Sequence, residues 1–196
     1  MAARPYTLRK RALSQEETRA RIVDATVAVH EELGPRNATI TAIAERAGVQ
    51  RLTVYRHFPD EDALFAACTG KWLGDHPPPQ PETWEAGETP LLRCRSALVA
   101  FYRYYAGTRR MWQVSFRDEP EIPALKAPMN MFRSYLASVS ARLALDFGGN
   151  DRVKATVTHL LAFPTWESLA DQGLDPEAAA DLAMLWVAAA ADAPRK

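Results

Sequence analysis

The chain has 196 residues, with 24 Lys and Arg balanced by 24 Asp and Glu, which allows one large domain or a small domain joined to a larger one. No apolar segment follows Met1, and the longest apolar run is much shorter than the about 20 residues that span a membrane, so we expect a cytoplasmic protein with no membrane partner. Cys68 and Cys94 form no CxxC pair, which argues against a disulfide framework and favours reduced, buried thiols.

Helical periodicity recurs along the whole chain and no alternating strand pattern occurs, which predicts an all-α fold. Residues 1–13 are expected to form a flexible basic arm. The first helix is expected to begin at Ser14, whose side chain can cap the amide of Glu17. This helix is expected to end before Gly34 and Pro35, because proline blocks its continuation.

The next segment predicts two short helices joined by a tight turn. Thr39 is the expected N-cap of the first, Gly48 forms the turn, and Pro59 ends the second. Once the apolar positions are assigned to packing, an outer surface of polar, aromatic and basic side chains is left: Gln50, Arg51, Thr53, Tyr55, Arg56 and His57. This layout is typical of a helix-turn-helix that reads DNA. Residues 1–58 also hold 10 Lys and Arg against 6 Asp and Glu, a local basic excess that suits phosphates.

The remainder of the chain predicts a larger helical domain. Asp60 and its acidic neighbours open a further helix, and the segment 74–90 is too rich in proline and glycine for regular helix. We therefore expect a helix-turn-helix domain at residues 14–73, a Pro-rich connector at 74–90 and a helical domain at 91–196. Asp175 and Pro176 mark the start of the last helix.

The helix-turn-helix segment resembles the DNA-binding domain of the tetracycline-repressor (TetR) family of bacterial transcriptional regulators. The shared pattern consists of a Thr-capped helix, Ile-Ala, Ala-Gly-Val, Thr-aliphatic-Tyr-x-His-Phe and Leu-Phe. In this chain the pattern is carried by Thr39, Ile43, Ala44, Ala47, Gly48, Val49, Thr53, Val54, Tyr55, His57, Phe58, Leu64 and Phe65. The resemblance covers about a quarter to a third of the chain, and the length and helical remainder also fit the family.

The resemblance implies which residues meet DNA. Base contacts in the major groove are implied for Gln50, Arg51, Leu52 and Tyr55, with Thr41 near a further contact position. Phosphate contacts are implied for Thr39, Thr53, Tyr55 and His57. Arg51 is the best candidate for reading a base, because a guanidinium can bridge O6 and N7 of guanine. The chain departs from the family at Gln50, where a capping Ser is common, and at Glu61, where a phosphate-binding Lys is common.

A palindromic duplex operator requires two recognition helices, so a homodimer is expected, paired through the last two helices as in the family. Those helices equally suit packing within their own chain. The family also implies a small-molecule effector. Candidate lining residues, each of which also suits a plain core, are Tyr102, Tyr105, Trp112, Phe116, Met131, Tyr135, His159 and Trp166. We expect a repressor released by a hydrophobic ligand; the alternative is a structural or partner-controlled DNA-binding protein without an effector.

An enzyme is the remaining alternative, and the sequence gives it little support. His30 and Glu31 begin a zinc-protease string, but Gly34 stands where the second histidine is needed. No nucleotide-binding glycine motif, P-loop or nucleophile elbow occurs. We therefore expect no catalytic activity, no cofactor and no metal.

Overall fold

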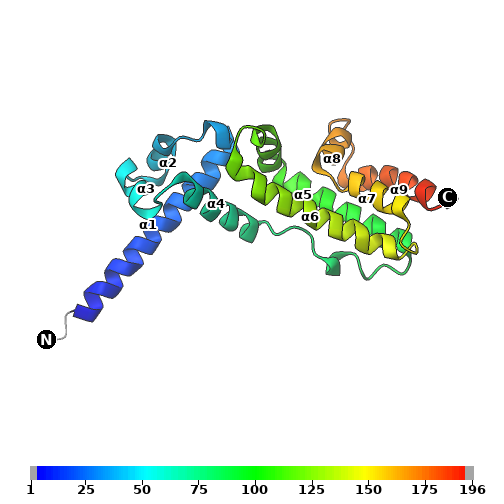
Figure 1. The fold of residues 1–196 in the computed structure, drawn as a ribbon, viewed down its shortest axis with the longest axis horizontal. Coiled ribbons are helices and arrows are strands. Elements are labelled where there is room, and N and C mark those ends of the chain that lie inside the picture. The colour runs from blue at the N-terminus through cyan, green and yellow to red at the C-terminus, as the bar shows by residue number, and fades with distance from the viewer. Residues whose placement is uncertain (1–3, 193–196) are drawn as a thin grey trace. The chain divides into compact units, whose positions relative to one another are not determined.

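The computed structural model describes the backbone of residues 4–192, with the side chains of Lys10 and of residues 12–192. The regular structure in this part of the chain is helical and includes no strand, which confirms the all-α prediction (Figure 1). It divides into two compact units. One consists of the N-terminal residues as far as His76 together with Gln113–Pro128, and the other of Pro77–Trp112 together with the residues from Met129 onward. The expected helical domain at 91–196 is thus shared between the units, because residues 113–128 group with the N-terminal helices.

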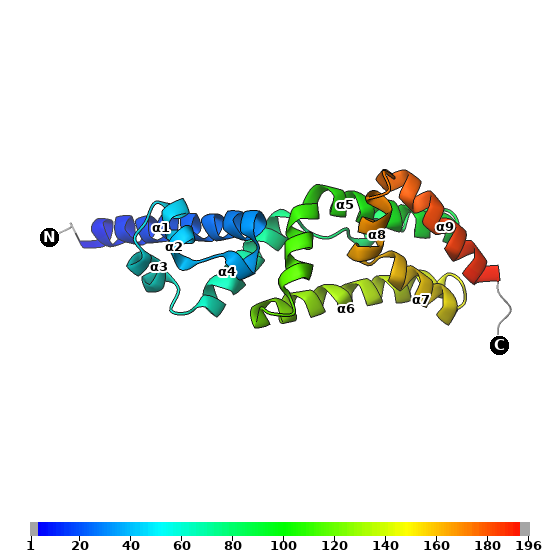
Figure 2. The ribbon, with the colours of Figure 1, turned by 90° about the horizontal axis from the view of Figure 1, so that it is seen from above.

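The first unit is built on a long helix, and Figure 2 shows the shorter helices gathered beside it. Helix α1 (Arg4–Leu33) packs against α2 (Ile40–Ala47) and α4 (Glu61–Asp75), and α2 packs against α3 (Arg51–His57). A short 3-10 helix, η1 (Pro35–Asn37), joins α1 to α2. The shared core consists of Ile22, Val23, Ala25, Val29, Ile43, Ala44, Ala47, Val54, Phe58, Leu64 and Cys68.

The start of α1 differs from the prediction. Helix α1 begins at Arg4, so Ser14 is an interior residue whose carbonyl accepts a hydrogen bond from the Thr18 hydroxyl. The expected flexible arm is therefore helical over residues 4–13, while residues 1–3 lie outside the described part of the chain. The reason is local: Pro5 suits a first helical turn, and the residues that follow it include several good helix formers.

Three local signals act as predicted in this unit. The Thr39 side chain accepts a hydrogen bond from the amide of Ala42 and caps α2. Gly48 ends α2 in the left-handed conformation, with φ 66° and ψ 38°. The Asp60 carboxylate accepts from the amide of Ala63 at 2.7 Å and caps α4. These residues fix the short connections on either side of α3.

The second unit contains η2 (Pro81–Thr83), most of α5 (Pro90–Asp118) and α6 (Pro123–Leu145), and all of α7 (Asp151–Leu160), α8 (Phe163–Ala170) and α9 (Pro176–Asp192). Helix α7 packs against both α8 and α9. The Pro-rich segment is anchored to this unit by Trp84, which is buried 6.0 Å from the ring of Phe101.

Interruptions of the long helices follow the sequence closely. Helix α5 leaves helical geometry at Thr108, so its last part, residues 109–118, forms a separate helical segment. Pro164 lies in the first turn of α8, directly after the break between α7 and α8. Helix α9 begins at Pro176, and Asp175 accepts a hydrogen bond from the amide of Ala178.

Candidate nucleic-acid interface

Helix α3 presents one face to the core of the first unit and the other to solvent. Val54 and Phe58 are buried against α1 and α2. Arg51, Leu52, Tyr55 and Arg56 are exposed on the remaining surface of α3. A helix that is held from one side, with long polar and aromatic side chains on the other, suits insertion into the major groove of B-DNA.

The other predicted contact residues lie around this surface. Thr41 and Gln50 are exposed, while Thr53 and His57 are half-buried. Thr39 is exposed even though its hydroxyl oxygen caps α2. Gln50 occupies the N-cap position of α3 without a side-chain hydrogen bond, so its amide is free to meet a ligand.

The arginines near this surface differ in whether an acidic side chain neutralises them. Arg46 on α2 is paired with Glu32, donating to both carboxylate oxygens at 2.8 Å and 2.5 Å. Among the described residues, Arg51 and Arg56 have no carboxylate partner. Their positive charge is therefore available to phosphates or base edges. Glu61 is exposed in the first turn of α4, where its charge suits the helix dipole.

A contact that the sequence did not reveal supports the far end of α3. The guanidinium of Arg19 on α1 lies 5.0 Å from the centre of the Phe58 ring. A cation over an aromatic face is attractive, and here it joins α1 to the residue that ends α3. The sequence pattern contains no sign of it, because the two residues are 39 positions apart.

The corner between α1 and α2 is held by residues 117–121. Asp118 is 1% exposed, and its carboxylate accepts from the amide of Arg36 at 3.1 Å. Arg117 donates to the carbonyl of Leu33 at 3.1 Å and to the Asp118 carboxylate at 2.6 Å. Burial alone would raise the pKa of Asp118, but the hydrogen bonds from Arg117 and from the Arg36 amide lower it below its ordinary value.

Only glycine fits at this corner. Gly34 has φ 85° and ψ 153°, a region that side chains disfavour. A Cβ at Gly34 would lie 2.0 Å from a guanidinium nitrogen of Arg117 and 2.4 Å from a carboxylate oxygen of Asp118. Gly34, Arg117 and Asp118 thus form a close-packed joint that orients the entry to the helix-turn-helix.

His30 lies buried near the same corner. Its Nδ1 is 3.5 Å from the Sγ of Cys68, and its ring lies 5.3 Å from that of Phe65. Burial lowers the pKa of His30 to about 4, and the negative charge of Asp118 opposes the shift. Burial raises the pKa of the Cys68 thiol to about 12. Both groups are therefore uncharged at neutral pH.

The buried, neutral state of His30 predicts acid sensitivity. In the unfolded chain His30 binds a proton below pH 6.5, whereas in the folded protein it binds one only near pH 4. The free energy of unfolding is therefore highest above pH 6.5 and falls as the pH drops from 6.5 to about 4. The free energy of unfolding is expected to drop by about 3 kcal/mol across this window because of His30. Urea denaturation at several pH values is expected to show a shallower decline in His30→Gln. Parallel curves for the two proteins would contradict this prediction.

Comparison with known proteins identifies the segment that carries this surface. The family model described as "Bacterial regulatory proteins, tetR family" matches residues 22–68, a range that holds all of α2 and α3. Residues 22–68 form a DNA-binding domain of the TetR family. The resemblance expected from the sequence is thereby confirmed.

Curated relatives of the TetR-family domain are regulators of transcription. The chain is 34% identical over 80 residues to the HTH-type transcriptional repressor KstR of Mycobacterium tuberculosis, covering 41% of this chain and 36% of the relative. It is 50% identical over 50 residues to the HTH-type transcriptional regulator SrpR of Pseudomonas putida, covering 26% of this chain and 24% of the relative. The matches thus span less than half of each relative.

Solved structures share the fold over a longer range. A TetR-like transcriptional regulator from Rhodococcus sp. RHA1 aligns with a TM-score of 0.67 at 23% identity, covering 87% of this chain and 93% of the other. The multidrug binding protein EbrR, solved in complex with imidazole, aligns with a TM-score of 0.58 at 18% identity, covering 92% and 93%. The fold beyond the TetR-family domain is therefore also that of these regulators.

The candidate effector residues are only partly brought together. Tyr105 is buried among aromatic rings, with its centroid 5.7 Å from that of Trp166 and 6.0 Å from that of Trp112. Tyr102 and Tyr105 donate from their hydroxyls to the carbonyls of Leu160 and Leu161, at 3.0 Å and 2.7 Å. These four side chains form an aromatic cluster in the second unit, in which the buried indole nitrogen of Trp166 has no hydrogen-bond partner among the described residues.

The other candidates lie elsewhere. Met131 is 70% exposed, because Met129 and Phe132 are buried on the other side of α6. Phe116 belongs to the first unit. Tyr135 is half-buried and donates to the carbonyl of Pro79. His159 is exposed and its ring is parallel to that of Trp186 at 6.2 Å.

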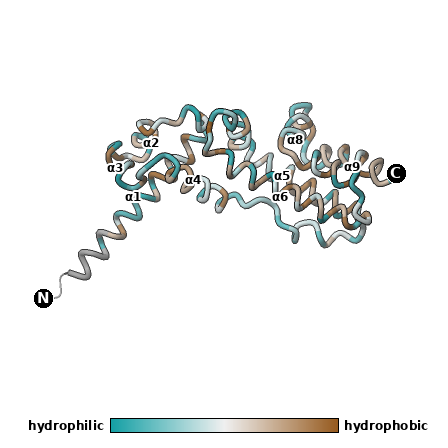
Figure 3. The backbone as a smooth tube through the Cα atoms, viewed as in Figure 1, coloured by the Kyte–Doolittle hydropathy of each residue, from teal (hydrophilic) through white to brown (hydrophobic). Residues whose placement is uncertain are grey.

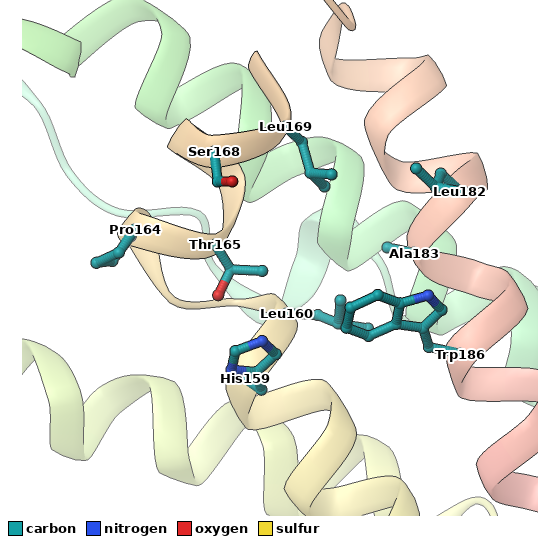
Figure 4. Close-up of a pocket in the computed structure, with 9 residues that line it drawn as sticks. All are labelled: His159, Leu160, Pro164, Thr165, Ser168, Leu169, Leu182, Ala183 and Trp186. Carbon is teal, nitrogen blue, oxygen red and sulfur yellow. The ribbon is translucent and has the colours of Figure 1, made fainter. Parts of the chain in front are cut away.

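The second unit contains a hollow that the sequence did not predict. It has a volume of about 360 Å³ and lies between α7, α8 and α9 (Figure 4). The nine side chains that line it are His159, Leu160, Pro164, Thr165, Ser168, Leu169, Leu182, Ala183 and Trp186. Much of α9 is hydrophobic in Figure 3, and it exposes Leu182, Leu185 and Trp186 on one side.

Among residues 4–192, no group of three or more His, Cys, Asp or Glu side chains is arranged to hold a metal ion. Over the same residues, no helix combines the length and hydrophobicity needed to cross a membrane.

Proposed function

We propose that this protein is a sequence-specific DNA-binding regulator of transcription. In this proposal it is a repressor that leaves a palindromic operator when a small hydrophobic ligand binds. The observation that carries the proposal is the exposed face of α3, with Arg51, Leu52, Tyr55 and Arg56 free on a helix whose other face is buried. KstR is named as a repressor, which supports the direction of regulation.

The chemistry of the α3 face assigns roles to its side chains. Arg51 reads guanine through two parallel hydrogen bonds, and Gln50 reads a neighbouring base through its amide. Arg56 and the hydroxyls of Thr39, Thr41, Thr53 and Tyr55 contact phosphates together with His57 and set the position of α3 in the groove. Electrophoretic mobility shift with duplexes of defined sequence, at several salt concentrations, tests this division of roles.

Two copies of the chain are required to read a two-fold symmetric site, and the exposed side of α9 is the proposed contact. Leu182, Leu185 and Trp186 are spaced at i, i+3 and i+4, so they share one face of α9. Ala189, four positions after Leu185, is exposed and small, which allows close approach of a second helix. The hollow between α7, α8 and α9 borders this face and accepts side chains from the partner in the proposed dimer.

Leu185→Glu is expected to weaken the dimer at least tenfold. Leu185 is 65% exposed, so the change leaves the fold of one chain intact while placing a charge in the contact twice. Leu145→Glu is the matched control, because Leu145 on α6 is 64% exposed. Sedimentation equilibrium measures both dissociation constants. Equal weakening by the two variants, or none by Leu185→Glu, would contradict the assignment of α9.

The effector is proposed to bind in the second unit, near the aromatic cluster of Tyr102, Tyr105, Trp112 and Trp166. EbrR is named as a multidrug binding protein, which supports a hydrophobic ligand. The close contacts among the rings of the cluster argue against a ligand site there and favour the alternative of a DNA-binding protein without an effector. Titration of hydrophobic aromatic compounds against the protein–operator complex distinguishes the two: release supports the effector, and no release by any compound favours the alternative.

A further inference from the structure

Leu52 is the most exposed large hydrophobic side chain among the described residues, at 76%. It is the second residue of α3, directly after Arg51. Tyr55 follows it by three positions and Arg56 by four, so all three side chains share one stretch of the helix surface. Leu52 differs from the other exposed hydrophobic side chains because it lies on the face of α3 that meets DNA in the proposed function, where an aliphatic side chain can be buried against a base.

The surface that α3 meets in the proposed function contains one kind of apolar group. The major-groove edges of adenine, guanine and cytosine carry hydrogen-bond donors and acceptors, whereas thymine also carries a C5-methyl group. Burying an aliphatic side chain against a polar base edge leaves donors or acceptors without partners. A methyl group is therefore the one base feature that matches Leu52.

We propose that Leu52 specifies thymine by packing against its C5-methyl group, at a base pair neighbouring the one read by Arg51. This inference rests on the proposed function, because it requires α3 to lie in the major groove. It assigns to Leu52 a chemical preference that Arg51 and Gln50 cannot supply, since their side chains recognise hydrogen-bonding groups.

Replacement of thymine by uracil tests the proposal, because uracil pairs with adenine in the same way and lacks only the methyl group. The probe is the duplex that the full-length protein selects from a random library, with each thymine replaced in turn at both symmetric positions. At one pair of positions the Kd is expected to rise about fourfold for each methyl group removed. This factor corresponds to the free energy of burying one methyl-sized apolar group. When the methyl group is removed from both half-sites, the Kd is expected to rise about fifteenfold.

Two variants assign that effect to one side chain. Leu52→Ala is expected to bind the thymine and uracil duplexes within about twofold of each other, and because Leu52 is exposed the change leaves the core intact. Leu145→Ala, at a leucine on α6 that is 64% exposed, is expected to keep the full discrimination. Selective binding in which no thymine methyl matters, or in which Leu52→Ala still discriminates, overturns the proposal alone. Failure to select any sequence overturns the proposed function and this inference with it.

Discussion

Gly34→Ala is expected to destabilise the first unit by about 3–5 kcal/mol. Part of this cost is backbone strain, because φ 85° with ψ 153° is accessible essentially to glycine alone. The rest arises because the new Cβ displaces Arg117 and Asp118, whose hydrogen bonds to Leu33 and Arg36 are then lost. Hydrogen–deuterium exchange of the amides in α1 to α4 measures the change.

A matched glycine separates strain from contact. Gly173 also has a positive φ, 84°, but a Cβ there meets no atom within 4 Å. Gly173→Ala is therefore expected to cost only the strain, about 1–2 kcal/mol. Asp118→Ala removes the same contacts from the other side, so its effect and that of Gly34→Ala are expected to be less than additive in the double variant. Equal costs at Gly34 and Gly173, or full additivity, would contradict the proposed joint.

Arg51→Ala is expected to weaken binding to the selected operator by about 1–3 kcal/mol for each recognition helix and to relax the preference at one base pair. The cause is the loss of two parallel hydrogen bonds to guanine, which no neighbouring side chain on α3 replaces. Arg51→Lys keeps the charge but not the planar fork, so it is expected to recover phosphate attraction and little of the base preference. Fluorescence anisotropy with operator and scrambled duplexes measures both quantities.

The outcome on scrambled DNA decides the role of Arg51. If Arg51 reads a base, affinity for the scrambled duplex changes much less than affinity for the operator. Arg133→Ala, the same substitution at an exposed arginine on α6, serves as the matched control and is expected to alter neither. Equal losses on both duplexes for Arg51→Ala would show that the residue contacts phosphates instead.

Much of the helix-turn-helix was predictable because its signals are local. The caps at Thr39 and Asp60 act on amides three residues away, and Gly48 ends α2 through its own backbone conformation. The periodicity that buries Val54 also leaves Arg51 and Tyr55 on the outer surface. Such features depend on a few neighbouring residues, so a single sequence contains them.

The features that were missed depend on distant residues or on tertiary packing. Asp118 meets Arg36 across 82 positions, so nothing near either residue signals the joint at Gly34. The capping pattern at Ser14 was misleading, because the helix formers before it extend α1 to Arg4. Met131 was chosen for its residue type, whereas its position on α6 places it in solvent. Residue type alone does not distinguish side chains that line a pocket from side chains on the protein surface.

In the proposed complex, α3 of two identical chains lies in successive major grooves of one duplex. Selection of bound sequences from a random duplex library by the full-length protein is the decisive experiment. We expect a two-fold symmetric motif whose half-sites are centred about 10 base pairs apart, or a multiple of that distance. Enrichment of an asymmetric motif would contradict the paired recognition helices, and the absence of any enrichment would contradict the DNA-binding role of α3.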